Sequence, residues 1–158
     1  MDMLNELADI PIFQDLDEQT IKLLAPLFER CACPAGTVIF EQGAPASHLY
    51  LLLQGTVTVR YKPYDGPPLT LTQLTSGGVF GWSAVVGNPY YTSATLAKDD
   101  VTTLRMRATD LHHLVLEHPE EGQVLLDELA RKVSNRWVDA SRQVRVILDK
   151  AIRKEPIP

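Results

Sequence analysis

The spacing of apolar side chains divides the chain into a helical start, a β-rich middle and a helical end. Residues 4–10 and 17–30 have apolar positions at helical spacing, and Pro26 is expected to bend or divide the second helix. From Cys31 the pattern changes to short β-rich runs separated by turn residues. These runs cover residues 38–40, 49–53, 56–61, 69–72, 92–97 and 101–106. Roughly eight short strands at this spacing favour a mainly β sandwich or barrel.

The last third of the chain is expected to be helical. A short helix opens at residues 109–111 and ends near 118–119, and a long helix follows from about 120 to 150. Apolar side chains on the long helix alternate in steps of four and three, the heptad pattern of a two-stranded coiled coil. The alternative is a helix packed along its own strands. The heptad favours a homodimer, with an interface formed by Leu126, Ala130, Val133, Trp137, Ala140, Val144 and Ile147.

Length and targeting signals place the chain in a broad class. Its 158 residues suit a single domain over residues 1–158. That domain would comprise N-terminal helices (1–30), a β region (31–107) and C-terminal helices (108–155). No apolar run approaches the length of a membrane span, and the acidic first residues lack the pattern of a signal peptide. We therefore expect a cytoplasmic protein with no membrane segment.

The net charge of −5 is unevenly distributed. Residues 131–154 carry a net charge of +6, so the remainder carries −11. We interpret this basic segment first as the solvated face of a helix. The alternative is a docking surface for an acidic protein partner or for nucleic acid. No helix-turn-helix pattern accompanies the charge, so we expect no DNA-binding domain.

The residue types that carry catalysis or bind metals form no convincing pattern. Cys31 and Cys33 lie two apart on an expected strand, so both side chains face the same side, and we favour buried packing over a disulfide or a metal site. The four histidines include no spaced pair with carboxylate support on the β region. No activated nucleophile or pair of acids stands out. We expect no enzymatic activity, no metal and no cofactor.

The glycine-rich segment 77–95 is the candidate binding site. A glycine pair leads through a short apolar run into a tight turn at Gly81, and a one-turn helix over residues 83–86 follows. Backbone amides at the start of such a helix attract anions or polar ligand atoms. Glycine lets a ligand approach the backbone closely. This layout is typical of a phosphate-binding cassette.

Several segments together carry a family resemblance. Residues 7–16 look like a helical entry, residues 35–43 (AGTVIFEQG) like an opening β-hairpin, and residues 49–57 (LYLLLQGTV) like a strand pair with a hallmark glycine. With the cassette, they resemble the cyclic nucleotide-binding domain of the catabolite activator/FNR superfamily over almost the whole chain. The resemblance implies a double-stranded β-helix (a jelly-roll-like β-roll) with N-terminal helices and a long C-terminal dimerisation helix.

The same resemblance identifies two changed positions in the cassette. In the family, the residue after the Phe-Gly turn is usually a glutamate that binds the ribose, and an arginine about nine positions later pairs with the cyclic phosphate. Those places hold Trp82 and Tyr91 here, and no Lys or Arg occurs between Lys62 and Lys98. A phosphate in a partly buried pocket needs charge-assisted partners. We therefore do not expect cAMP to bind in the usual way.

Aromatic residues gather where the charged pair is missing, and the family's long helix closes over its ligand. The resemblance therefore implies a non-catalytic sensor of a small, nucleotide-like effector, which would shift the packing of the dimer helices. One alternative is a ligand-free dimerisation or protein-interaction module whose aromatics fill the pocket. Another is a cAMP- or cGMP-binding protein that uses the helix cations. The candidate ligand-binding residues are Phe80, Gly81, Trp82, Ser83, Ala84, Tyr90, Tyr91, Thr92, Ser93, Lys132, Arg136 and Trp137.

Overall fold

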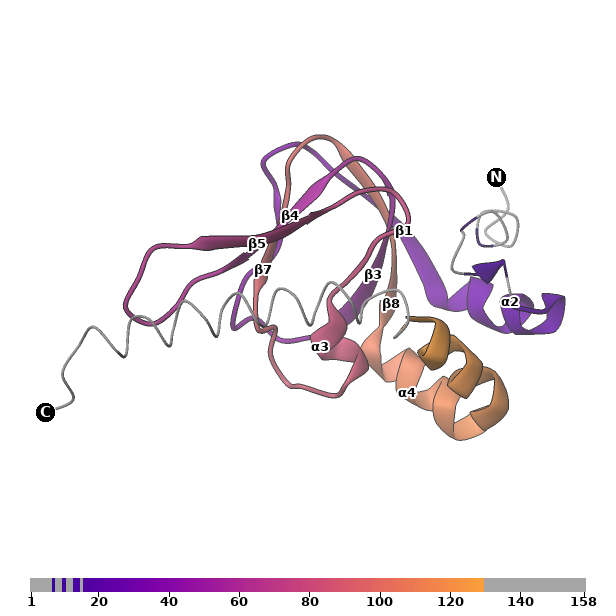
Figure 1. Ribbon diagram of the computed structural model, residues 1–158. Helices are drawn as coiled ribbons and strands as arrows, with labels where there is room; N and C mark the ends of the chain where they lie inside the picture. The colour runs from indigo at the N-terminus through magenta and orange to yellow at the C-terminus, as the bar shows by residue number, and fades with distance from the viewer. Residues whose placement is uncertain (1–6, 8–9, 11–12, 15, 130–158) are drawn as a thin grey trace, which may run out of the picture.

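The computed structural model describes residues 7, 10, 13, 14 and 16–129 of the chain (Figure 1). Within this part, eight strands form two four-stranded sheets, and helices precede and follow them. All the strand pairs are antiparallel. This architecture confirms the predicted β-roll flanked by helices. The predictions for residues 130–158, which include most of the heptad, lie outside the described residues.

The N-terminal helix is shorter than predicted. Helix α2 (Glu18–Leu24) begins after Asp17, whose carboxylate accepts a hydrogen bond of 2.7 Å from the amide of Thr20. The chain then tightens into the 3₁₀ turn η2 (Ala25–Leu27), which contains Pro26, and enters strand β1 (Phe28–Cys33). The prediction of helix up to residue 30 is therefore wrong. Pro26 has no amide hydrogen to continue the helical hydrogen bonding. Phe28, which the prediction placed in a helix, is instead buried as the first residue of β1.

The two sheets are built from strands that are distant in sequence. The first sheet has the order β1, β8 (Val101–Arg107), β3 (His48–Gln54) and β6 (Val79–Phe80). The second has the order β2 (Val38–Phe40), β7 (Ala94–Ala97), β4 (Val57–Tyr61) and β5 (Leu69–Leu74). Strand β7 begins two residues later than the predicted strand 92–97. The cassette joins the two sheets, because β6 precedes it and β7 follows it.

The helices after the strands pack on the outer face of the first sheet. The one-turn helix α3 (Trp82–Val85) follows β6, and α4 (Ala108–Glu117) continues directly from β8. Residues 119–129 are also helical, and a Cβ at Gly122 would lie 2.9 Å from the Cα of Val115, so this helix lies tightly against α4. Figure 1 shows α2 and α4 on the same side of the strands. No helix among the described residues is long and apolar enough to span a membrane.

Two apolar clusters divide the interior. The first cluster lies between the first sheet and the helices, and it includes Phe13, Leu24, Leu104, Leu111 and Leu129. Leu126, a predicted dimer-interface residue, is partly buried and packs against this cluster. The second cluster lies between the two sheets and includes Phe40, Tyr50, Val57, Phe80 and Tyr91. The cassette thus contributes its aromatic side chains to the inside of the β-roll.

The turn between β3 and β4 depends on Gly55. This residue has φ of +91°, and a Cβ there would meet the backbone oxygen of Asp100 and lie 2.8 Å from a carboxylate oxygen of Asp99. The same Asp99 oxygen accepts a 2.7 Å hydrogen bond from the amide of Thr56. The loop before β8 therefore fits under the turn only when position 55 lacks a side chain.

We expect Gly55→Ala to be considerably more destabilising than Gly36→Ala. Gly36 also has a positive φ, but a Cβ there would meet open space, so its substitution costs only the backbone strain of about 1–2 kcal/mol. Gly55→Ala adds a clash with backbone that cannot move aside, and should exceed its control by at least about 1 kcal/mol. Urea unfolding of the two variants measures this difference. Equal losses would show that the contact at Gly55 is easily relieved.

Candidate functional site

The cassette turn is pressed against strand β3. Gly81 has φ of +79°, and a Cβ there would lie 2.8 Å from the carbonyl oxygen of His48 and 3.2 Å from a ring carbon of Tyr50. Both the backbone conformation and the packing therefore require glycine at this position. A side chain at position 81 would point into the protein, against β3. The close packing of the turn on β3 therefore explains why this residue is glycine.

The amides of α3 are partly engaged within the chain. The Ala84 amide donates to the carbonyl oxygen of Gly81 at 3.1 Å, and Ser83 and Ala84 are both buried. The carbonyl of Ser83 accepts a hydrogen bond from the Asn88 amide at 3.0 Å, which closes the turn after the helix. A helix of four residues has only a weak dipole to add to these contacts.

The predicted ligand-binding residues point in different directions. Phe80 and Tyr91 are buried in the second cluster, whereas Trp82 is half-buried and packs against the first. Tyr90 is 59% exposed. Thr92 is also exposed, and Ser93 is half-buried. The structure therefore does not bring these side chains into one lining. The remaining predicted residues, Lys132, Arg136 and Trp137, lie outside the described residues.

Four rings form a continuous stack inside the β-roll, which we call the aromatic stack: Phe40, Tyr50, Phe80 and Tyr91. The rings of Tyr91 and Phe40 are 3.7 Å apart between centroids and tilted by only 15°. Those of Tyr50 and Phe80 are 4.9 Å apart and nearly parallel, and Phe40 lies 6.1 Å from Phe80. The Tyr91 and Phe40 rings therefore lie nearly face to face, and the centroid distance of Tyr50 and Phe80 is typical of stacked rings, which stabilise a core beyond the area that they bury.

Tyr91 is also held through its hydroxyl group. The hydroxyl donates a 2.6 Å hydrogen bond to the carbonyl oxygen of His48 and accepts one of 3.0 Å from the amide of the same residue. The backbone of Tyr91 is paired with the loop before β3, through Gly43 and Ala44. Burial raises the pKa of the Tyr91 phenol, so it stays neutral. Tyr91 is thus a fixed part of the core.

Polar groups that the sequence analysis did not select lie beside the aromatic stack. Arg105 on β8 pairs in register with Glu29 on β1 and with Tyr50 on β3. One terminal nitrogen of Arg105 (Nη2) lies 3.1 Å from a carboxylate oxygen of Glu29. This contact lowers the pKa of Glu29. Side chains alternate between the two faces of a sheet along each strand, so in this register Glu29, Arg105 and Tyr50 lie on the same face.

His48 lies at the end of the same face. Its ring nitrogen Nδ1 is 2.8 Å from the hydroxyl of Ser47. Burial lowers the pKa of the His48 ring, and the positive charges of Arg105 and Arg107 add to this effect, while the carboxylates of Glu29 and Asp110 oppose it. The imidazole is therefore neutral at pH 7.

The two thiols are half-buried on β1, and neither is in a disulfide. Burial raises the pKa of both Cys31 and Cys33, so each is a protonated and weakly nucleophilic thiol. Cys33 packs against the second cluster, as the predicted packing role requires. Among the described residues, no group of three or more His, Cys, Asp and Glu side chains could hold a metal ion.

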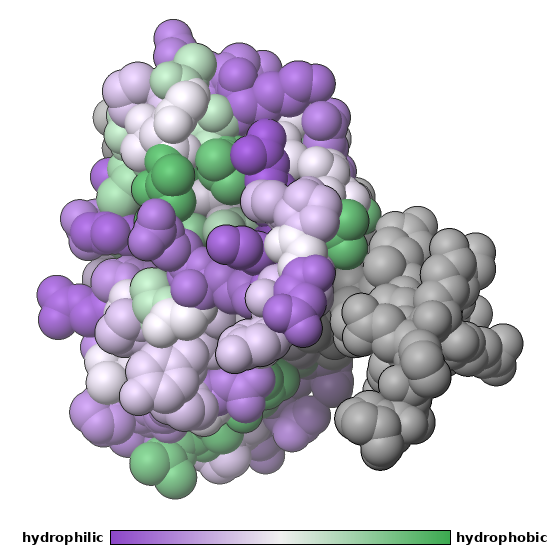
Figure 2. Space-filling model, turned by 90° about the vertical axis from the view of Figure 1, so that its left-hand side faces the viewer, coloured by the Kyte–Doolittle hydropathy of each residue, from purple (hydrophilic) through white to green (hydrophobic). Residues whose placement is uncertain are grey.

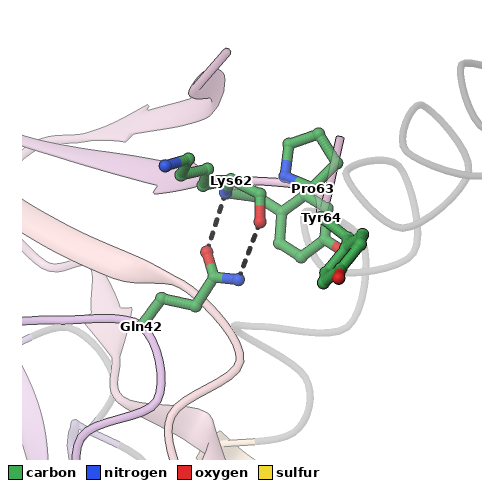
Figure 3. Close-up of a pocket in the computed structure, with 5 residues that line it drawn as sticks. Gln42, Lys62, Pro63 and Tyr64 are labelled. Carbon is green, nitrogen blue, oxygen red and sulfur yellow. Dashed lines mark hydrogen bonds between the residues drawn. The ribbon is translucent and has the colours of Figure 1, made fainter. Parts of the chain in front are cut away.

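Two adjoining hollows lie at the loop end of the β4–β5 hairpin, and neither is lined by a predicted ligand-binding residue. The larger, of about 480 Å³, is bordered by Gln42, Tyr61, Lys62, Pro63 and Tyr64 (Figure 3). The Gln42 amide bonds to both the carbonyl and the amide of Lys62, at 2.9 and 2.7 Å, which fixes the hairpin. The smaller hollow, of about 280 Å³, shares Gln42 and Lys62. The view in Figure 2 shows a mostly hydrophilic face with separate small apolar areas.

Comparison with known proteins agrees with this geometry. The family model "Cyclic nucleotide-binding domain" matches residues 30–118, which include all eight strands except the first residues of β1, together with the cassette. A CRP-like cAMP-activated global transcriptional regulator of Mycobacterium tuberculosis is 27% identical over 127 residues. The match covers 80% of this chain but only 57% of that protein. The chain thus spans little more than half the length of this relative.

Solved structures support the same fold. A putative cyclic nucleotide-binding protein from Geobacter metallireducens superimposes with a TM-score of 0.76 and 28% identity, covering 87% of this chain and 99% of that one. The regulatory subunit of a cAMP-independent protein kinase A from Trypanosoma cruzi, bound to guanosine, gives a TM-score of 0.73. It is 21% identical, and the match covers 94% of this chain and 50% of that one.

We expect Tyr91→Phe to destabilise the domain by about 1–3 kcal/mol, because it removes both hydrogen bonds to the His48 backbone and keeps the ring. Tyr90→Phe is the matched control, because Tyr90 is the next residue in the chain and its side chain is 59% exposed. This substitution should change stability by less than about 0.5 kcal/mol. Chemical denaturation measures both. Similar values for the two variants would show that the Tyr91 hydroxyl bonds are replaced by water at no cost.

Stability should decrease between about pH 7 and pH 5, partly through His48. The folded protein holds the pKa of this ring below its ordinary value, so the unfolded chain binds a proton first as the pH falls. His48→Gln should make the decrease shallower. His112→Gln, which replaces an exposed histidine on α4, should leave the slope of the wild type. Thermal unfolding followed across this pH range tests the difference between the two slopes.

Proposed function

This chain belongs to the cyclic nucleotide-binding domain family, and we propose that it is a regulatory domain that senses a small effector without the family's charged cassette contacts. The proposal depends on the burial and the contacts of Tyr91. In the place of the phosphate-binding arginine there is a buried phenol, stacked on Phe40 and bonded twice to the His48 backbone. The family is non-catalytic, and we extend this to the chain as a whole.

Three features of the cassette would weaken the binding of a cyclic phosphate. The cassette offers no arginine or lysine, because none lies between Lys62 and Lys98. The phenol that replaces it cannot turn toward a ligand without breaking its hydrogen bonds and its stack. Trp82, in the place of the ribose-binding glutamate, packs against the first cluster and offers no carboxylate. Ordinary high-affinity capture of cAMP is therefore disfavoured.

The proposed effector is a small, ring-bearing molecule held between the cassette and the long C-terminal helix. Flat rings suit a site whose neighbourhood is aromatic. The guanosine-bound structure from T. cruzi shares the fold and contains a nucleoside without a phosphate, which makes nucleosides sensible probes. Lys132, Arg136 and Trp137 would face the effector from the long helix.

The proposal includes a homodimer formed through the long helix, in a cytoplasmic protein. The heptad supports it, and Leu126 at its start packs partly against the first cluster, so the helix would leave the domain from a fixed base. Effector binding would favour one packing of the dimer helices over another. The basic segment 131–154 would remain free for an acidic partner. A monomer in sedimentation equilibrium would contradict the dimer.

The rival reading is a ligand-free interaction module, and one observation favours it. The aromatic stack occupies the space between the sheets, so the β-roll is filled by its own side chains. The two readings differ in a thermal-shift experiment, because any ligand that binds the native state raises the melting temperature by mass action. Failure of adenosine, guanosine, AMP and cAMP to raise it would favour the ligand-free module.

We expect isothermal titration of the wild type with cAMP to give a Kd weaker than about 1 mM. The double variant Trp82→Glu/Tyr91→Arg, which restores both family side chains, should bind cAMP at least about tenfold more tightly. The matched control Trp82→Glu/Tyr90→Arg places the new cation one residue away, on an exposed side chain, and should not gain affinity. Tight stoichiometric binding of cAMP by the wild type would overturn the proposal.

A further inference from the structure

One row of side chains crosses the entire first sheet and ends at the cassette. In register, Glu29 on β1 lies opposite Arg105 on β8, Arg105 lies opposite Tyr50 on β3, and Tyr50 lies opposite Phe80 on β6. Side chains in register on antiparallel strands share one face of the sheet. The row, which we call the Arg105 row, therefore connects a guanidinium directly to the residue that precedes the cassette turn.

The Arg105 row faces the inside of the β-roll. Leu52 and Val101, which lie two and four positions along β3 and β8 from the row, are buried in the second cluster. Tyr50 and Phe80 themselves belong to the aromatic stack. Arg105 itself is only partly buried, because 31% of its side chain is exposed, so water can still solvate its charge.

The partner seen in the structure uses only part of the guanidinium. Arg105 donates from Nη2 to a Glu29 oxygen at 3.1 Å, while its Nε is enclosed and has no hydrogen-bond partner. The Arg105 side chain is 31% exposed and that of Glu29 is 58% exposed, so this ion pair is open to water and correspondingly weak. The guanidinium also has a side-chain hydrogen bond with Tyr50. Because its Nε is enclosed, a ligand would reach Arg105 only through the part of the guanidinium that remains exposed.

A second cation flanks the row. Arg107 follows Arg105 by two positions, so it lies on the same side of β8, and it is exposed opposite His48. The positive charge of Arg105 also acts on two tyrosines of the aromatic stack, Tyr50 and Tyr91. Burial raises the pKa of both Tyr50 and Tyr91, and the positive charge of Arg105 partly opposes this rise. The guanidinium thus lies close to the phenol that has replaced the family's arginine.

We propose that Arg105, flanked by Arg107, binds the terminal phosphate of a ring-bearing effector, and that Glu29 is the counter-ion which this phosphate displaces. The inference rests on the proposed function and names the chemical class of the effector. Two guanidinium groups favour a phosphate monoester over a cyclic diester, because the monoester carries close to two negative charges and more free oxygens. Tyr50 and Phe80 beside the guanidinium are buried in the aromatic stack, so the ring of the effector is inferred from the proposed function alone.

Adenosine, cAMP, AMP and inorganic phosphate separate the contributions of ring and anion, since the first three share a base and a ribose. Their dissociation constants would be measured by titration calorimetry for the wild type, Arg105→Gln, Arg107→Gln and Glu29→Gln. Arg60→Gln is the matched control, because this exposed arginine lies on β4 of the other sheet. Circular dichroism checks that each variant folds, and the substitutions at Glu29 and Arg107 affect exposed side chains.

The wild type should bind AMP at least about tenfold more tightly than adenosine or cAMP. Arg105→Gln should remove this preference and leave adenosine unchanged, and Arg107→Gln should reduce it. Glu29→Gln should strengthen AMP binding several-fold, because it releases the guanidinium. Arg60→Gln should match the wild type within about twofold.

Equal affinities of the wild type for AMP and adenosine would overturn the inference and leave the proposed effector-binding function intact. An unchanged AMP preference in Arg107→Gln and Glu29→Gln would also overturn it, even if Arg105→Gln failed to fold. Binding of inorganic phosphate as tightly as AMP would overturn the assignment to a ring-bearing effector. Absence of binding by all four probes would count against the inference and the proposed function together.

Discussion

The clasp between Tyr91 and His48 is the contact on which the cassette depends. One hydroxyl group satisfies both the amide and the carbonyl of the first residue of β3, and its ring is stacked on Phe40 of the other sheet. Because buried backbone groups must be paired, this phenol takes over a task that strand pairing performs elsewhere. Gly81 packs against the same carbonyl of His48. A single residue of β3 therefore anchors both the beginning and the end of the cassette.

The clasp also bears on the function that we propose for the cassette. In the family that this chain belongs to, the resemblance places a charged side chain where Tyr91 lies, directed at a ligand. Here the side chain is directed into the protein, where its hydroxyl bonds to the His48 backbone and its ring stacks on Phe40. An arginine at this position would be costly to bury without an anionic ligand to pair with its charge. A neutral ring in that place strengthens the core.

Charge has nevertheless not left the interior of the β-roll. The Arg105 row crosses all four strands of the first sheet, from an exposed carboxylate at its edge to Phe80 beside the cassette. The two faces of this sheet have different roles, because its outer face is sealed by apolar contacts with the helices. The inner face combines stacked rings with a partly paired guanidinium. In the role that we propose for Arg105, effector binding and core packing would share this face of the sheet.

Alternation of apolar residues, turn glycines and helical periodicity were enough to predict a mainly β sandwich or barrel, its flanking helices and the one-turn helix of the cassette, and the family resemblance narrowed this to a β-roll. These signals are local, so the sequence alone carries them. The sequence also shows that no Lys or Arg lies between Lys62 and Lys98. Only the tertiary structure decided where each side chain points: Phe28 begins a strand, Tyr91 turns inward, Trp82 joins the other cluster, and Arg105 lies beside Tyr50. Those outcomes depend on pairings between strands far apart in the chain, and no local pattern records such pairings.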